Sequence, residues 1–282
     1  MPADPTKVAL YSQDTFDVAN PTPQQIDAMV AAAEDINASG FGTVILGQWH
    51  VHSDGSIYYN NSPLDSVIQA LKVIPTALKL GGSVKKVLIT FGPFGADFQG
   101  IQKNLAQFKK TIAGVQAMTD IDGLDWDLEQ DYNQFSGLLV DLTKWANGLG
   151  MMVTAAPYEE TSFWTNVLKK TNTGGAAGFS WWNLQLYGGA YYPDWVTSLQ
   201  GLVPNPQAFL VPGYSVDQGS TPSDVQTNLS QLQSSAPGLD GGFIWRYESI
   251  AHAGFTTAQY ASAIAAGLGG AAGAAKGKAA RL

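Results

Sequence analysis

The chain alternates between short runs of apolar residues and longer stretches in which apolar residues recur with helical spacing. Runs such as KVLITF at 86–91 are typical of buried β-strands. The stretch 133–149 instead places Phe135, Leu138, Leu142 and Trp145 on one helical face. This alternation repeats eight times along the chain and predicts eight strand–helix units.

Each predicted strand is short and is followed by one helical stretch. The predicted strands are 7–11, 43–48, 86–91, 122–129, 151–156, 179–187, 208–212 and 241–245. The predicted helices are 22–37, 63–80 (broken or kinked at Pro75), 98–118, 133–149, 162–169, 193–202, 222–234 and 256–268. Eight such units in a chain of this length predict an α/β fold, a single (β/α)8 TIM barrel.

The barrel is expected to span residues 1–268, followed by a flexible Gly/Ala-rich tail over residues 269–282. Strand seven ends near Tyr214 and strand eight begins near Gly241, a gap of about 26 residues. The predicted helix 222–234 uses half of that gap. We therefore expect no inserted α+β domain between strands seven and eight.

The segment DGLDWDLE, residues 122–129, packs four carboxylates into eight positions. Asp125, Asp127 and Glu129 are spaced at i, i+2 and i+4, which places all three on one face of a strand. Neighbouring carboxylates repel one another and resist desolvation, so the pattern suits a site where one acid keeps its proton beside an ionised neighbour. A solvated acidic turn or a calcium loop is the alternative, but the alternating apolar residues favour a strand.

DGLDWDLE resembles the D-G-x-D-x-D-x-E signature of glycoside hydrolase family 18, which contains chitinases and some endo-β-N-acetylglucosaminidases. Gln185 and Tyr187 resemble the family's Gln-x-Tyr, Trp245 its strand-eight tryptophan, and the TAAP stretch 154–157 that of plant class III chitinases. Two positions depart from the pattern. TFGP at 90–93 stands where Ser-x-Gly-Gly is common, and Gly188 stands where many chitinases have Asp.

The resemblance implies a role for each matched residue in a substrate-assisted reaction, in which the sugar's own acetamide is the nucleophile. Glu129 would donate the proton. Asp127 would bind the acetamide N–H, with Asp125 beneath it sharing a proton. Tyr187 would orient the acetamide carbonyl, and Trp245 would form the floor under the sugar. Asp122 is expected to be structural.

The predicted strand ends are rich in aromatic and amide side chains, which suit sugars because flat rings cover C–H faces while polar neighbours bind hydroxyls. The expected substrate-binding residues are Tyr11, Gln48, Trp49, Phe91, Tyr158, Gln185, Tyr214 and Trp245. His50 and His52 are expected at the rim of the groove. Two histidines are too few for a metal site without further ligands, so we expect no metal.

The composition of the chain limits the classes of molecule that it can be expected to bind. The 282-residue chain has 13% charged residues, a net charge of −8 and no cysteine. Such acidity disfavours nucleic acid and anionic membranes and suits a neutral polymer such as chitin or another N-acetylglucosamine oligosaccharide. The sequence contains no convincing phosphate-binding loop, so we expect no nucleotide cofactor. We expect a monomer. The first residues do not resemble a signal peptide, and a secreted protein is expected after removal of a leader.

Three functions fit the pattern. The first is an endo-acting retaining chitinase that cleaves β-1,4 linkages in N-acetylglucosamine polymers, with an open cleft and poorly processive cutting. The second is an endo-β-N-acetylglucosaminidase acting on the chitobiose core of N-glycans. The third is a non-catalytic chitinase-like lectin. The presence of Asp125, Asp127, Glu129 and Tyr187 favours an enzyme, because such lectins usually lack the acid or the acetamide-binding aspartate.

Overall fold

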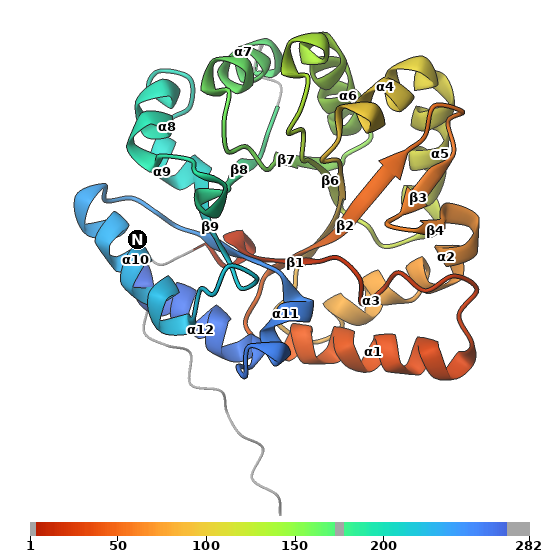
Figure 1. Cartoon of the computed structure of the whole chain (residues 1–282), viewed down its shortest axis with the longest axis horizontal. Helices are drawn as coiled ribbons and strands as arrows, with labels where there is room; N and C mark the ends of the chain where they lie inside the picture. The colour runs from red at the N-terminus through yellow and green to blue at the C-terminus, as the bar shows by residue number, and fades with distance from the viewer. Residues whose placement is uncertain (1–3, 173–177, 270–282) are drawn as a thin grey trace, which may run out of the picture.

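A closed barrel of parallel strands forms the centre of the computed structural model, which describes residues 4–172 and 178–269 (Figure 1). The barrel strands are β1 (Val8–Ser12), β2 (Thr43–Val51), β5 (Lys86–Phe91), β6 (Gly123–Trp126), β7 (Met152–Ala155), β8 (Trp181–Leu184), β9 (Leu210–Ser215) and β10 (Gly242–Trp245). β1 pairs in parallel with both β10 and β2, which closes the barrel.

Helices surround the barrel as an outer ring (Figure 1). They are α1 (Pro23–Ala38), α2 (Leu64–Leu71), α3 (Ile74–Lys79), α4 (Gly95–Lys103), α5 (Leu105–Met118), α6 (Ser136–Gly148), α7 (Thr161–Thr171), α8 (Tyr192–Leu199), α9 (Pro206–Phe209), α10 (Pro222–Ser235), α11 (Tyr247–His252) and α12 (Thr257–Gly267). The predicted (β/α)8 barrel is confirmed. The predicted helices 63–80 and 98–118 are each two helices, and Pro75 lies in the first turn of α3.

Several helices begin at a residue whose side chain binds the first free backbone amides. Thr22 Oγ1 accepts a hydrogen bond from Gln25 N at 3.3 Å, and Gln25 Oε1 accepts one from Thr22 N at 2.9 Å. Thr221 and Asp224 form the same reciprocal pair before α10. These capping boxes define where the connecting loops stop and the helices begin.

Alternation along the strands divides the apolar residues into two layers. Ala9, Tyr11, Ile45 and Phe243 belong to the barrel interior. Their strand neighbours pack outward against the helices, where most of the core lies. Asp125 lies between Leu124 and Trp126, which both face the helices, so its carboxylate points into the barrel.

Two connections between barrel strands can be compared with their predicted structure. Residues 49–62 lie between a predicted strand and a predicted helix. In the structure they complete β2 and add β3 (Ile57–Tyr59) and β4 (Ser62–Pro63), and β3 pairs with β2, and β4 with β3, as antiparallel strands. Between β9 and β10, residues 216–241 are all described and contain one element, α10, so the predicted absence of an inserted domain is confirmed. The predicted tail beyond Gly269 lies outside the described residues.

No helix in the described part of the chain is both long and apolar enough to cross a membrane.

Candidate active site

Three of the four carboxylates of the acidic segment, those of Asp125, Asp127 and Glu129, lie together toward the carboxyl end of the barrel strands. The predicted strand 122–129 is shorter in the structure, because β6 ends at Trp126. Backbone hydrogen bonds continue beyond it, from Asp127 N to Phe91 O at 2.9 Å and from Glu129 N to Pro93 O at 3.1 Å. These bonds keep Asp127 and Glu129 aligned with Asp125. The three form what is called here the carboxylate cluster.

Asp125 is the most enclosed member, with no exposed surface. Its Oδ1 accepts hydrogen bonds from Thr154 Oγ1 at 2.5 Å and Asn183 Nδ2 at 3.2 Å, and its Oδ2 accepts one from Tyr11 OH at 3.0 Å. Burial raises the pKa of Asp125, and these hydrogen bonds only partly oppose the rise. The sequence did not single out Asn183 as a partner, although alternation along β8 from Trp181 places it inward.

Asp127 is the centre of the cluster. Gln48 Nε2 donates to its Oδ2 at 2.9 Å and Gln185 Nε2 donates to its Oδ1 at 3.0 Å. Burial raises the pKa of Asp127 well above its ordinary value, and the negative charges of Glu129 and Asp125 raise it further. A hydrogen bond between Asp127 and Glu129 acts in the same direction. Asp127 therefore keeps its proton at a pH where an exposed aspartate is ionised.

Gln185 ties the cluster to the barrel wall. Besides Asp127, its Nε2 contacts Glu129 Oε1 at 2.9 Å and the carbonyl oxygen of Ala156 at 2.7 Å. An amide nitrogen has two hydrogens, so three acceptors compete for them and are drawn together. Gln48 and Gln185 were both predicted to bind substrate. In the structure their amide groups hold the carboxylates.

Aromatic side chains line the barrel mouth beside the cluster. The rings of Tyr11 and Trp245 lie 5.5 Å apart between centroids, and Tyr187 contacts Phe243 edge-on at 6.0 Å. Burial, followed by the charges of Asp127 and Glu129, raises the pKa of Tyr187 well above its usual range. Its phenol is therefore a neutral hydrogen-bond donor at physiological pH.

Tyr187 lies on a different secondary-structure element from the predicted one. The predicted strand 179–187 ends as β8 at Leu184, and Tyr187 lies on a short 3-10 helix, Leu186–Gly188. Tyr158 follows β7 nearby, and burial, Glu159 and Glu129 together raise its pKa to about 12.

Trp49 and Phe91 do not reach the groove, contrary to prediction. Both are fully buried, and their rings contact each other at 5.8 Å in the outer layer. Phe91 shares its strand face with Val87 and Ile89, which pack toward the helices. In β2 the pairing register shifts between Leu46 and Trp49, and such an irregularity reverses which side chains point outward. Gln48 therefore points to Asp127 and Trp49 to the core.

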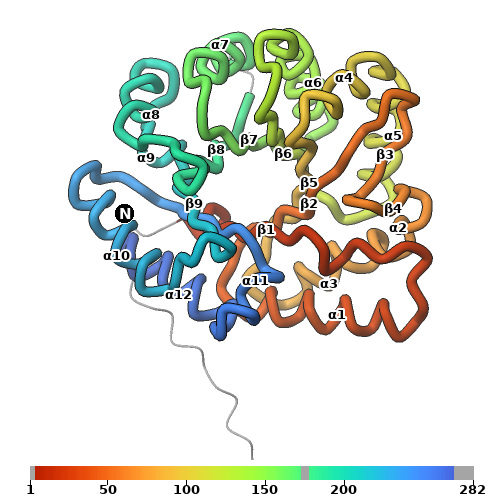
Figure 2. Tube along the Cα trace, viewed as in Figure 1, coloured from red at the N-terminus to blue at the C-terminus, as the bar shows by residue number. Residues whose placement is uncertain are grey.

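Tyr214 also belongs to the outer layer and is only 6% exposed, but it lines a hollow that Tyr187 shares. This hollow has a volume of about 670 Å3 between α8, α10 and the end of β9. A second hollow, of about 940 Å3, is lined by Gln48, His50 and His52. Gln48 and His50 belong to β2, whose backbone Figure 2 traces along the barrel wall. Gln48, which lines the larger hollow, donates a hydrogen bond to Asp127. Tyr187, which lines the smaller one, is close enough to Asp127 and Glu129 for their charges to raise its pKa.

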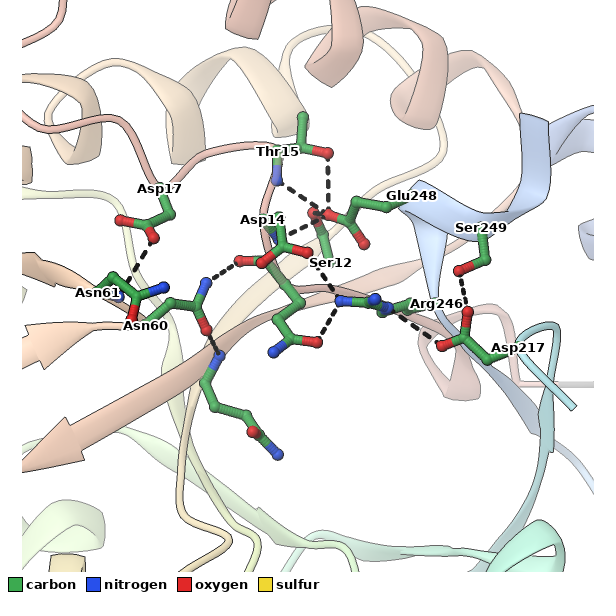
Figure 3. A network of polar contacts seen from close by, with 12 residues as sticks. Ser12, Asp14, Thr15, Asp17, Asn60, Asn61, Asp217, Arg246, Glu248 and Ser249 are labelled. Carbon is green, nitrogen blue, oxygen red and sulfur yellow. Dashed lines mark hydrogen bonds and ion pairs between the residues drawn. The ribbon is translucent and has the colours of Figure 1, made fainter. Parts of the chain in front are cut away.

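A polar network joins the loops around the mouth (Figure 3). Arg246 contacts Asp14 at 2.8 Å on one side and Asp217 at 3.2 Å on the other. Glu248 Oε1 accepts hydrogen bonds from Ser12, Asp14 and Thr15, two of them from backbone amides. These residues are called the rim network, and no sequence pattern predicted it.

The rim network connects to the cluster through Asn60. Its Oδ1 accepts a hydrogen bond from Gln48 N at 2.8 Å, and its own backbone N donates to Gln48 O at 2.7 Å. The Asn60 Nδ2 donates to the backbone carbonyl oxygen of Gln13, and the side-chain Oε1 of Gln13 accepts a hydrogen bond from Arg246. Asn60 thus holds the residue that binds Asp127.

Outside the barrel mouth, Asp122 has the structural role that was predicted. Its carboxylate pairs with Lys79 at 3.0 Å and Lys86 at 3.1 Å, and it accepts a hydrogen bond from Val87 N. Among residues 4–172 and 178–269, no group of three or more His, Asp or Glu side chains is arranged to hold a metal ion.

No family model matches the sequence, and no curated protein matches it either. Solved structures do match the fold. The catalytic domain of a family GH18 chitinase from the fern Peteris ryukyuensis is 19% identical, with a TM-score of 0.64 over 90% of this chain and 97% of that chain. The family 18 chitinase of Crocus vernus is 12% identical, with a TM-score of 0.56 over 88% and 95%.

A third match is active domain 2 of a thermostable chitinase from Pyrococcus furiosus, solved as catalytic-site mutants complexed with chito-oligosaccharides. It is 11% identical, with a TM-score of 0.58 over 87% of this chain and 85% of that chain. These likenesses cover nearly the whole barrel. The chain therefore has the fold of the family 18 chitinases.

Proposed function

We propose that the protein is a family 18 glycoside hydrolase that cleaves β-1,4 linkages between N-acetylglucosamine units by substrate-assisted catalysis. The observation that carries the proposal is the state of Asp127. It is buried, its pKa is raised by burial and by Glu129 and Asp125, and two amide donors fix it beside Glu129. A carboxyl group held in this way stabilises a neighbouring group and is a poor nucleophile.

The nucleophile is then supplied by the substrate. An N-acetylglucosamine unit resting on Trp245 has its 2-acetamido group directed toward Asp127 and Tyr187. Glu129 transfers a proton to the glycosidic oxygen as that C–O bond breaks, while the acetamide carbonyl oxygen bonds to the anomeric carbon. Asp127 binds the acetamide N–H and shares its proton with Asp125 beneath it, so that negative charge can develop beside the cationic ring. The Tyr187 hydroxyl donates to the attacking oxygen.

Water completes the reaction. Glu129, now ionised, takes a proton from a water molecule, which attacks the anomeric carbon and releases the carbonyl oxygen. Two displacements at the same carbon return the original β configuration. The product is a free reducing end, and every catalytic group regains its starting protonation state.

We also propose internal cutting in an open cleft. The connection between β9 and β10 contains α10 and adds no wall to the groove. The hollow lined by Gln48 borders α4, and the hollow lined by Tyr187 borders α8 and α10 on another side of the barrel, so we expect a polymer to lie between them across the cluster. On a soluble chitin derivative we expect viscosity to fall before many reducing ends accumulate.

The test is incubation with chitin oligosaccharides and, separately, with a high-mannose glycoprotein, with products identified by mass spectrometry. Chito-oligosaccharide fragments whose first-formed anomer is β by NMR support the proposal. Release of the glycan from the glycoprotein alone would instead indicate an endo-β-N-acetylglucosaminidase. Binding without products would indicate a lectin, and an initial α-anomer would exclude the substrate-assisted route.

A further inference from the structure

Trp245, the proposed floor under the sugar, is the last residue of β10, and its two neighbouring strands hold it unequally. On the β9 side it pairs with Ser215, and its carbonyl oxygen accepts a hydrogen bond from Val216 N at 2.6 Å. On the β1 side the pairing ends one residue earlier, where Leu10 lies opposite Ile244. The sheet therefore holds the backbone of Trp245 from one side only.

The indole ring of Trp245 is half-buried at the edge of the barrel interior. It packs against the ring of Tyr11, with the centroids 5.5 Å apart and the planes inclined by 55°. A ring packed at an edge in this way follows the backbone that carries it. The place of the floor therefore depends on how the chain is held where β10 ends.

Arg246 follows directly and supplies a link on both sides. Its Nη1 donates to Asp14 Oδ2 at 2.8 Å and to the side-chain Oε1 of Gln13, and both acceptors lie in the segment that follows β1. Its Nε donates to Asp217 Oδ2 at 3.2 Å, in the segment that follows β9. Figure 3 shows the guanidinium group between the two aspartates. One side chain thus joins the segments that flank Trp245.

This link matters for its geometry more than for the strength of each ion pair. The side chains of Asp14 and Asp217 are 57% and 41% exposed, and ion pairs with such exposed partners contribute little to stability. The guanidinium group holds its donors in a rigid planar fork, so binding both aspartates fixes it between the two segments. Asp217 is held in turn, because its Oδ1 accepts a hydrogen bond from Ser249 Oγ.

We infer that Arg246 is a positioning residue that acts through Trp245. By joining the two segments beside the end of β10, it keeps the indole where the sugar being cleaved rests on it. Glu129 protonates the glycosidic oxygen of that sugar, so a displaced floor moves the bond out of line with its acid. The inference rests on the proposed function, which assigns the floor to Trp245.

Lys7 forms a matching link at the opposite end of the same three strands. It lies just before β1, and its Nζ contacts Asp240 Oδ2 at 3.0 Å, just before β10, and the carbonyl oxygen of Ala208 at 2.7 Å, just before β9. Lys7→Met is therefore the matched control for Arg246→Met, because each substitution keeps an unbranched apolar stem and removes the charged donors.

The test is a double-mutant cycle in kcat/KM for chitohexaose, with Arg246→Met, Trp245→Ala and the double variant. We expect Arg246→Met to lower kcat/KM about tenfold, mostly in kcat, and to have almost no further effect in the Trp245→Ala background. Arg246→Lys should recover part of the loss, because lysine keeps the charge without the fork. Lys7→Met should leave kcat/KM unchanged in both backgrounds.

Thermal unfolding verifies that each variant is folded. Asp217→Ala, at an exposed position, breaks only the β9 side of the link and replaces Arg246→Met if that variant does not fold. Its loss should be smaller and should also disappear in the Trp245→Ala background. Equal losses in the wild-type and Trp245→Ala backgrounds, or no loss at all, would overturn the inference while the proposed function stands.

If the wild-type protein does not cleave chitohexaose, the proposed function fails. Fluorine NMR of protein labelled with fluorotryptophan then decides whether Arg246 positions Trp245. The Trp245 signal is identified by its loss in Trp245→Ala. It should shift in Arg246→Met and stay in place in Lys7→Met, and a signal that does not move in Arg246→Met would overturn the inference.

Discussion

Two groups of acids lie at the same end of the barrel, and their protonation is controlled in opposite ways. In the carboxylate cluster, burial and like charges raise the pKa of Asp127. In the rim network, burial also pushes the pKa of Glu248 upward, but hydrogen bonds from Thr15, Ser12 and neighbouring backbone amides outweigh it and lower the pKa. The balance between burial and like charges, which raise the pKa, and hydrogen bonds to the carboxylate, which lower it, decides the outcome.

This contrast separates the roles of the two groups. Glu248 fixes loops through one oxygen, because its Oε1 accepts four hydrogen bonds while its buried Oε2 has no partner among the described residues. Asp127 has two amide donors, one of which, Gln185, also donates to Glu129, and it has like charges on both sides. This arrangement is unfavourable for folding and useful for acid–base chemistry. The predictions below test this distinction, beginning with the largest expected effect.

Glu129→Gln should lower kcat at least about 100-fold, because positioned acid catalysis contributes roughly 10²–10⁴. The substitution is nearly isosteric, so the thermal midpoint and binding of chitohexaose should remain close to those of wild type. Glu34→Gln, on the exposed face of α1, is the control and should be fully active. A Glu129→Gln enzyme that keeps more than about a tenth of wild-type turnover would contradict the acid role.

Glu248→Ala should lower the free energy of unfolding by about 3 kcal/mol, because it leaves the Ser12 hydroxyl and the amides of Asp14 and Thr15 without an acceptor. Chemical denaturation measures the change. Glu248→Gln keeps an acceptor oxygen and should lose much less. Equal losses in the two variants would mean that the charge of Glu248, and not its hydrogen bonds, supports the rim.

The pH dependence of stability should have opposite signs at the two groups. The folded pKa of Asp127 lies above 3.8, so the folded state binds the extra proton and its contribution is lost as pH rises through that pKa. Asp127→Asn should therefore gain stability relative to wild type as pH rises from about 4 toward neutral, by on the order of 1 kcal/mol.

Glu248 behaves in the reverse way. Its folded pKa lies below 4.5, so its contribution is present above that pH and is lost as pH falls through the folded pKa. The stability gap between wild type and Glu248→Gln should be widest near neutral pH and should narrow in acid. Unfolding curves across this range measure both variants, and parallel pH profiles would refute the contrast.

Asn60→Gly should give the smallest effect, a fall in kcat/KM of about threefold to tenfold, because one hydrogen bond to Gln48 N is lost. Gly retains the positive φ of 45°. Since the Gln48 hydrogen bond lowers the pKa of Asp127, loosening it should move the Asp127-dependent limb of the pH–rate profile to higher pH. Asn20→Gly, at a φ of 47° on another loop, is the control and should leave the profile unchanged.

Alternation along single strands was readable from the sequence and was correct where the strands were regular. It places Asp125 inward between Leu124 and Trp126, and it would also have placed Phe91 outward with Val87 and Ile89. It failed for Trp49, because the irregularity in β2 depends on pairing with β5 and is invisible in the β2 sequence alone.

The sequence by itself determined the barrel and the identity of its acids, because strand and helix periodicity and the spacing of Asp125, Asp127 and Glu129 are local properties. Only the tertiary structure decided how those acids are held. Tyr11 and Asn183 reach Asp125 from positions 114 and 58 residues away, and Gln48 reaches Asp127 from 79 residues away. Closure of the barrel brings these donors together, and their number and geometry at each carboxylate set its protonation.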